Sequence, residues 1–123
     1  WTNSGTTFTT SYVADGAKAT QFNNTDSITK AISTANYESI HLEYKRMTRA
    51  FDATGDNFYA EWYDGNVWRT LEQLTANSAW TDKDYLLPSG ADNNPNFQIR
   101  FRTSCGSLDY AHVDLVRVTG TPQ

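Results

Sequence analysis

Apolar and polar residues alternate with a period of two along several short segments of this 123-residue chain, and this alternation constrains the fold most strongly. In segment 39–45, Ile40, Leu42 and Tyr44 fall on one side, because successive side chains of a β-strand point to opposite faces. Helical periodicity is hard to find. The alternation predicts an all-β chain, and the other segments that show it are 57–63, 96–103 and 110–115.

Turn signals divide the chain into roughly nine predicted strands. Asp64-Gly65-Asn66 predicts a hairpin turn, which Trp68 follows as an expected core residue. Trp80 is expected in a loop before a strand at 82–87. Val116 breaks the alternation of the last strand and predicts a β-bulge. Weaker patterns predict three earlier strands, at 8–13, 17–22 and 27–32.

No linker, internal repeat or shift in composition divides the chain, so a single domain over 1–123 is expected, with its core at about 6–119. The 17 aromatic residues can fill a core, and the lone Cys105 can form no internal disulfide. Many short strands with apolar faces predict a two-sheet antiparallel β-sandwich, of which the jelly roll is the favoured form.

Charge and composition narrow the classes of partner. Ten Lys and Arg against 14 Asp and Glu give a net charge of -4, which disfavours a protein that binds nucleic acid through its phosphates. No apolar run approaches the roughly 20 residues that span a bilayer, so no membrane partner is expected. Abundant Thr, Ser and Asn are typical of secreted bacterial β-modules, and a monomer is expected.

The outward positions carry the predicted binding site. If the four alternating segments share one sheet, their polar side chains gather on its outer face. Tyrosine offers a flat apolar ring with a hydroxyl, and charged side chains hydrogen-bond sugar hydroxyls. For these residues, cross-strand pairing that only keeps the face soluble is the alternative. Trp80 is a further candidate platform, and its alternative role is to cover the end of the core. The strand residues of the predicted site are His41, Glu43, Tyr59, Glu61, Tyr63, Arg100, Arg102, Tyr110 and His112.

Three stretches resemble jelly-roll modules of the carbohydrate-binding and MAM-like kind. Phe58 to Gly65 followed by Trp68 is similar to the strand, turn and tryptophan of these modules. The stretches 28–33 and 37–42 are similar to their preceding strand pair, and 97–102 with 109–114 resembles their closing strands. The resemblance implies a non-catalytic module that binds a polysaccharide or oligosaccharide and is linked to the catalytic domain of a secreted bacterial hydrolase.

The resemblance also implies a structural calcium ion. Oxygen-rich turns lie at Asp15-Gly16, at 52–57 and at Asp114, and calcium takes six to eight oxygen ligands. Asp15 and Asp114 are the candidate ligands, while turn formation is the alternative role for these aspartates.

Catalysis is the less favoured class of function. The chain has no Gly-x-Ser-x-Gly motif, and its two histidines, His41 and His112, lie in predicted strands. A small polysaccharide-active enzyme stays as an alternative, either a hydrolase that uses Glu43 with Glu61 or a lyase that uses Tyr, His and Arg. A structural module that docks onto a secreted protease or hydrolase is the other alternative.

Overall fold

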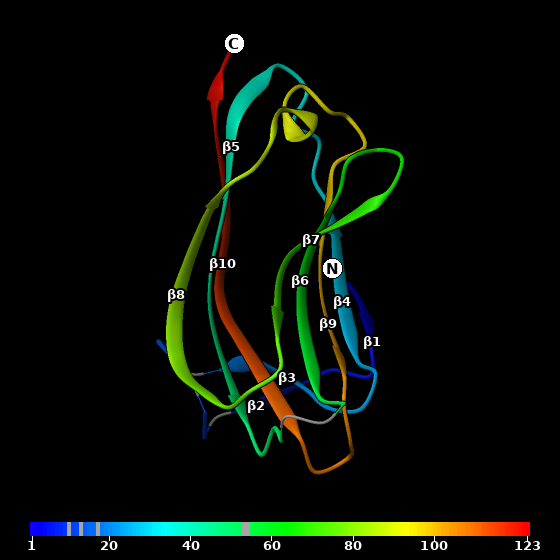
Figure 1. Cartoon of the computed structure of the whole chain (residues 1–123). Helices are drawn as coiled ribbons and strands as arrows, with labels where there is room; N and C mark the ends of the chain where they lie inside the picture. Colours follow the sequence, from blue (N-terminus) through cyan, green and yellow to red (C-terminus); the bar gives the residue numbers. More distant parts are fainter. Residues whose placement is uncertain (10, 13, 17, 53–54) are drawn as a thin grey trace.

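The computed structural model describes residues 1–9, 11–12, 14–16, 18–52 and 55–123, which form two facing five-stranded antiparallel sheets (Figure 1). The first sheet, sheet A, contains β1 (Thr2–Ser4), β4 (Ser27–Ala31), β9 (Gln98–Ser104), β6 (Asn57–Tyr63) and β7 (Trp68–Leu74), in that spatial order. The second, sheet B, contains β2 (Thr7–Thr9), β3 (Ala19–Phe22), β10 (Tyr110–Pro122), β5 (Tyr37–Arg49) and β8 (Ser78–Leu86). A short 3-10 helix, η1 (Ser89–Ala91), follows β8, and no helix in the described ranges is long and apolar enough to cross a membrane.

The strand order is that of a jelly roll. Strands β3 to β10 form two four-stranded arrays, ordered β4-β9-β6-β7 and β3-β10-β5-β8, so the chain passes from one sheet to the other at nearly every connection. The hairpin of β6 and β7 stays within sheet A. Strands β1 and β2 extend one edge of each sheet. The predicted all-β jelly-roll sandwich is therefore confirmed.

Alternating inward residues of both sheets form the core. On β5, Ile40, Leu42 and Tyr44 are buried as predicted. Tyr44 packs edge-on against Phe101 of the opposite sheet, with ring centroids 4.9 Å apart. On β10 the pairing with β5 shifts between Asp114 and Arg117, which confirms the predicted bulge near Val116.

Strand β8 is longer than its sequence pattern indicated. Trp80 lies within β8 rather than in a loop, because the long strand β5 pairs with β8 from Leu86 back to Ser78. At the ends of the chain, β1 begins at Thr2 and β10 continues to Pro122, so strands extend beyond the expected core range of 6–119.

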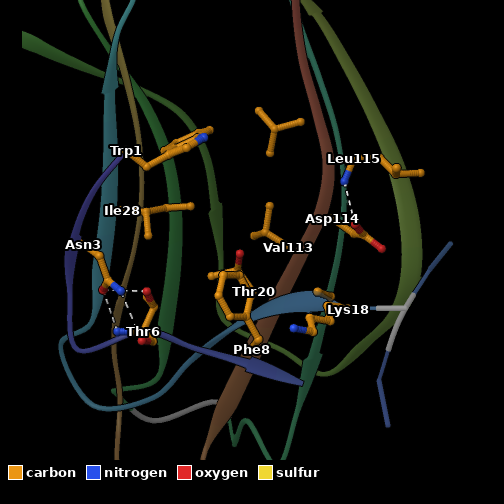
Figure 2. A pocket seen from close by; sticks show the side chains of 12 residues that line it. Trp1, Asn3, Thr6, Phe8, Lys18, Thr20, Ile28, Val113, Asp114 and Leu115 are labelled. Atoms are coloured by element: carbon orange, nitrogen blue, oxygen red, sulfur yellow. Dashed lines mark hydrogen bonds between the residues drawn. The ribbon is translucent and has the colours of Figure 1, made fainter. Parts of the chain in front are cut away.

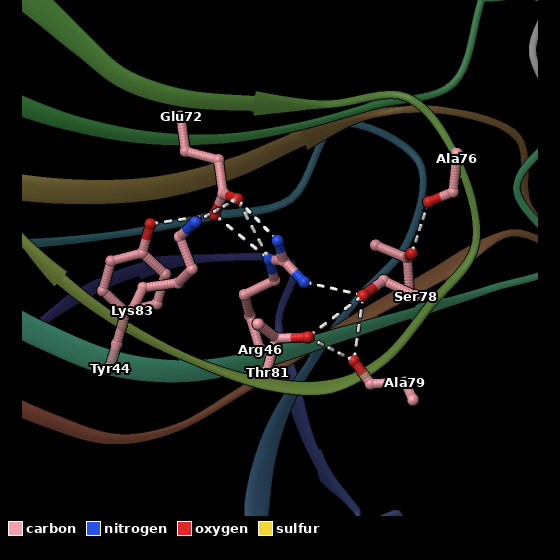
Figure 3. A network of polar contacts seen from close by, with 9 residues as sticks. Tyr44, Arg46, Glu72, Ala76, Ser78, Ala79, Thr81 and Lys83 are labelled. Atoms are coloured by element: carbon pink, nitrogen blue, oxygen red, sulfur yellow. Dashed lines mark hydrogen bonds and ion pairs between the residues drawn. The ribbon is translucent and has the colours of Figure 1, made fainter.

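A buried polar network joins the two sheets between β7 and β8 (Figure 3). The Arg46 guanidinium of β5 donates to both carboxylate oxygens of Glu72 on β7, with Nη2 to Oε2 at 2.7 Å. The Tyr44 hydroxyl donates to the same carboxylate at 2.9 Å, and Lys83 Nζ lies 3.6 Å from it. The Arg46 and Glu72 side chains are only 7% and 9% exposed. Hydrogen bonds surround the Glu72 carboxylate, as a buried charge requires.

Candidate functional site

The predicted site residues lie on two opposite outer faces of the sandwich. Strands β6 and β9 belong to sheet A, whereas β5 and β10 belong to sheet B, so the expectation that all four share one sheet is wrong. Alternation within a strand reports which residues point inward, but it carries no information about which sheet the strand joins. Sheet A carries Tyr59, Glu61, Tyr63, Arg100 and Arg102, and sheet B carries His41, Glu43, Trp80, Tyr110 and His112.

Strand pairing brings the five predicted residues of sheet A together. Tyr59 lies opposite Arg102 and Glu61 opposite Arg100 across the β6–β9 pair. On the other side of β6, Trp68 of β7 lies opposite Tyr63. Cross-strand partners point to the same face of a sheet, so these six residues, the arginine–aromatic face, form one continuous outer surface.

A buried carboxylate holds both arginines of the arginine–aromatic face. Glu61 Oε1 accepts hydrogen bonds from Arg100 Nε at 2.9 Å and Arg102 Nε at 2.7 Å, and its Oε2 accepts from Arg102 Nη2 at 3.2 Å. Burial raises the pKa of the Glu61 carboxyl, but hydrogen bonds from Arg102 and Arg100 outweigh it and hold the pKa below its usual value. Glu61 is therefore ionised at neutral pH, and both guanidinium groups are fixed in position.

Each of these arginines also lies over an aromatic ring. The guanidinium carbon of Arg100 lies 4.0 Å from the centroid of the Trp68 ring, and that of Arg102 lies 4.0 Å from the centroid of the Tyr59 ring. A guanidinium over an aromatic face gains electrostatic and stacking energy. The Tyr63 ring contacts Trp68 at a tilt of 44°. The face thus combines oriented donors with partly exposed aromatic surface.

Trp68 corrects the sequence prediction, which placed it in the core. It is only partly buried, and it belongs to the outer face because the hairpin sets it opposite the outward Tyr63. The signal was available in the sequence. A hairpin turn at Asp64-Gly65-Asn66 pairs residue 63 with residue 68, and paired residues share a face.

Ion pairs between strands occupy much of the outer face of sheet B. Lys45 pairs with Asp82 at 2.9 Å, and Arg117 Nη2 pairs with Glu43 at 2.7 Å. Beside them, His41 Nδ1 forms a hydrogen bond with Asp84 Oδ1 at 2.9 Å. A groove of about 480 Å³ lies among these pairs. The charges of the Lys45–Asp82 and Arg117–Glu43 pairs neutralise each other across the strands, which is the arrangement expected of a soluble sheet face.

His112 is buried beneath an aromatic and cationic cluster on sheet B. Arg49 lies between Tyr12 and Tyr110, with its guanidinium carbon 4.2 Å and 3.9 Å from the two ring centroids. Arg49 Nε donates to His112 Nε2 at 3.1 Å. His112 is fully inaccessible, so it cannot contact a ligand directly. Sequence reasoning missed Arg49, although it continues the outward alternation of β5.

The structure does not place the residues of the two enzymatic alternatives where either reaction needs them. Glu43 and Glu61 lie on the outer faces of different sheets, so the predicted hydrolase pair cannot act on one glycosidic bond. Tyr110 and Arg49 do lie beside His112, as a lyase would need, but that histidine is shielded from solvent.

Trp80 lies on the opposite side of the sandwich from the arginine–aromatic face, so it cannot extend that surface.

A groove opens between the sheet edges where β1 and β2 lie (Figure 2). Its volume is about 470 Å³, and Ile28 of β4 and Val113 of β10 line it. Trp1 and Phe8 also line the groove and stay 54% and 72% exposed.

The two predicted calcium ligands lie close together but serve as turn acceptors. Asp114 Oδ2 accepts from the backbone amides of Ala14 and Asp15, and its Oδ1 accepts from that of Leu115. Among the described residues there is no group of three or more His, Cys, Asp or Glu side chains placed to hold a metal ion. The remaining turn, 52–57, includes positions 53 and 54, which lie outside the described residues. Calcium binding stays a prediction.

Comparison with solved structures finds carbohydrate-binding modules that share this fold. A family 61 carbohydrate-binding module in complex with β-1,4-galactotriose superimposes with a TM-score of 0.71 at 8% identity, over 98% of this chain and 86% of that one. A family 16 carbohydrate-binding module gives 0.70 at 11% identity, over 93% and 84%. A CBM22 xylan-binding domain from Paenibacillus barcinonensis Xyn10C gives 0.57 at 14% identity, over 100% and 86%.

The chain has the fold of these carbohydrate-binding modules. No protein-family model matches its sequence, and no curated protein sequence matches it either. At these low identities the likeness concerns the arrangement of strands, so the choice of binding residues depends on the geometry of this chain.

Proposed function

We propose that this domain is a non-catalytic module that binds a polysaccharide through its arginine–aromatic face. The observation that carries the proposal is the Glu61 clamp, which holds two guanidinium groups over the rings of Trp68 and Tyr59. Fixed donors beside aromatic surface suit sugar rings, which present hydroxyl groups at their edges and apolar C–H groups on their faces. Preorganisation lowers the entropy cost of binding.

The neighbours in fold support the same class of ligand. One was solved with β-1,4-galactotriose, and another is described as a xylan-binding domain. A surface with a few fixed donors and two or three aromatic rings would bind with a dissociation constant of roughly 1 mM to 1 μM. The module would then hold a linked catalytic domain of a secreted bacterial enzyme near its polysaccharide. Secretion is supported by the abundance of Thr, Ser and Asn in the sequence.

Docking onto a linked domain is the second candidate function. The groove between β1 and β2 favours it, because Trp1 and Phe8 expose apolar rings there. In this alternative the module stabilises its parent enzyme and needs no sugar.

A pair of tryptophan variants tests the proposed face. We expect the domain to be retarded in native gels that contain galactan, xylan or glucomannan. Trp68→Ala should weaken binding about tenfold or more, since it removes an aromatic surface of this face and the support of Arg100. Trp80→Ala is the matched control, because Trp80 lies on sheet B. Loss of binding in Trp80→Ala alone would move the site to sheet B, and no retardation by any glycan would refute the function.

A further inference from the structure

The two arginines of the arginine–aromatic face use their donors unequally. Arg102 donates to Glu61 through both Nε and Nη2, which forms a two-point contact. Arg100 donates through Nε alone. Within the described part of the chain, the structure gives Nη1 and Nη2 of Arg100 no acceptor. These two nitrogens form one edge of the guanidinium, and such an edge binds a carboxylate through two parallel hydrogen bonds.

The free edge of Arg100 is held in place before any ligand arrives. Its guanidinium rests on the Trp68 ring and is tied to Glu61, and the side chain is 26% exposed. An arginine so constrained loses little conformational freedom when it binds. A solvated surface arginine would instead have to order a long side chain.

The charge of this face is opposite in sign to that of the whole molecule. The pairing of β4, β6, β7 and β9 shows which of their residues point outward. Among the described outward residues of these four strands, Glu61 is the one with a carboxylate, and Arg100 and Arg102 carry positive charges. The face therefore carries one excess positive charge, whereas the chain carries a net charge of -4. An anion at this face is attracted by the nearby arginines, because salt screens the negative charges elsewhere on the molecule beyond about 8–10 Å.

We propose that the arginine–aromatic face recognises an acidic polysaccharide and that Arg100 binds the carboxylate of a uronic acid residue through its Nη1–Nη2 edge. This inference rests on the proposed function and adds the class of ligand. A planar fork fits a carboxylate, and Gln98, which lies opposite Tyr63, offers amide groups to neighbouring hydroxyls. One excess charge suits a glycan with isolated carboxylates better than the dense phosphates of nucleic acid.

Matched acidic and neutral polymers test the proposal with the unmodified domain. Polygalacturonate is compared with its carboxyl-reduced form, and glucuronoxylan with enzymatically deglucuronidated xylan, by affinity electrophoresis and calorimetry. We expect the acidic member of at least one pair to bind about tenfold tighter or more, since hydrogen bonds to a charged group are worth about that factor. Raising the salt concentration should reduce this preference.

Three variants then assign the preference to Arg100. Arg100→Gln should bring the two members of the pair to within about twofold, whereas Arg100→Lys keeps the charge without the fork and should recover only part of the preference. Arg117→Gln is the control, because it removes the same charge from an exposed ion pair on sheet B. Thermal unfolding of each variant verifies that the fold is intact.

The outcomes separate this inference from the proposed function. Equal binding of neutral and acidic members leaves polysaccharide binding in place but overturns the choice of uronate. Dextran sulfate or single-stranded DNA could also bind more tightly than every uronate polymer, with Arg117→Gln weakening this binding as much as Arg100→Gln does. That result would show unspecific charge attraction and would also overturn the choice of uronate. If uronate preference persists in Arg100→Gln, the assignment to Arg100 falls. Absence of binding to every polymer would refute both proposals.

Discussion

At the scale of single residues, His112 shows how burial controls protonation. Its ring is inaccessible to solvent, and Nε2 accepts a hydrogen bond from Arg49, so the proton of the neutral ring resides on Nδ1. Burial, and then the charge of Arg49, lowers the pKa of His112 to about 4. Nδ1 has no hydrogen-bond partner in the described chain. The folded protein therefore strongly prefers the neutral imidazole.

We expect the free energy of unfolding to fall between pH 6.5 and pH 4 because of His112. The pKa of His112 is about 4 in the folded state and about 6.5 when unfolded, so the unfolded chain binds the proton more tightly as the pH falls. The stabilisation is complete above pH 6.5, and about 3 kcal/mol of it is lost by pH 4. Urea unfolding at a series of pH values measures this loss.

His112→Gln should flatten this part of the pH profile, even if it lowers stability at neutral pH. The carboxyls of Glu61 and Glu72 have pKa values below the ordinary value of 4.5, so the stability that they contribute is lost from about pH 5 downward and overlaps only the acid end of the His112 window. A wild-type profile that stays level from pH 7 to pH 4 would contradict the burial of a neutral His112.

At the scale of strands, the Arg46–Glu72 pair ties β5 of sheet B to β7 of sheet A. Arg46→Met should destabilise the domain by about 3–5 kcal/mol, because it leaves the Glu72 carboxylate buried without its main partner. Lys45→Met on the same strand is the control. Lys45 pairs with exposed Asp82 on the outer face, so its loss should change stability little.

Denaturant unfolding of the two variants gives the comparison. Similar, small losses for both would mean that the Arg46–Glu72 contact contributes no more than a surface pair. The double variant Arg46→Met with Glu72→Met should recover part of the loss, since it removes both buried charges together.

The behaviour of single strands was predictable from sequence, and their assembly was not. Segment 57–63 alternates as β6 does, and Phe58 and Trp62 are buried as expected. The same rule made Glu61 outward-facing but could not show that two arginines of β9 would bury it. Sheet membership depends on pairing between distant segments, such as β3 with β10, which local alternation does not encode.

At the scale of the whole molecule, the proposed function concerns a parent enzyme. We expect removal of the module to lower the rate of that enzyme on insoluble polysaccharide several-fold and to leave its rate on short soluble oligosaccharides unchanged. Attachment to the polymer raises the local concentration of substrate without altering the chemistry of the active site. Rates of sugar release from both substrates, with and without the module, provide the measurement.

The docking alternative makes the opposite prediction for the same pair of proteins. Removal of a docked module would lower the thermal unfolding temperature of the catalytic domain and would slow its reaction on both substrates. Calorimetry of the parent and the truncated enzyme therefore decides between attachment to a polymer and support of a neighbouring domain.

The polar network shown in Figure 3 also affects self-association of the protein. Strands β7 and β8 are sheet edges, and free edges invite another strand to add to them and begin aggregation. Glu72 of β7 and Lys83 of β8 both point inward beside these edges. A strand that added there would have to cover these charges or draw them out of their contacts. The polar contacts that join the two sheets thus also act against fibre formation.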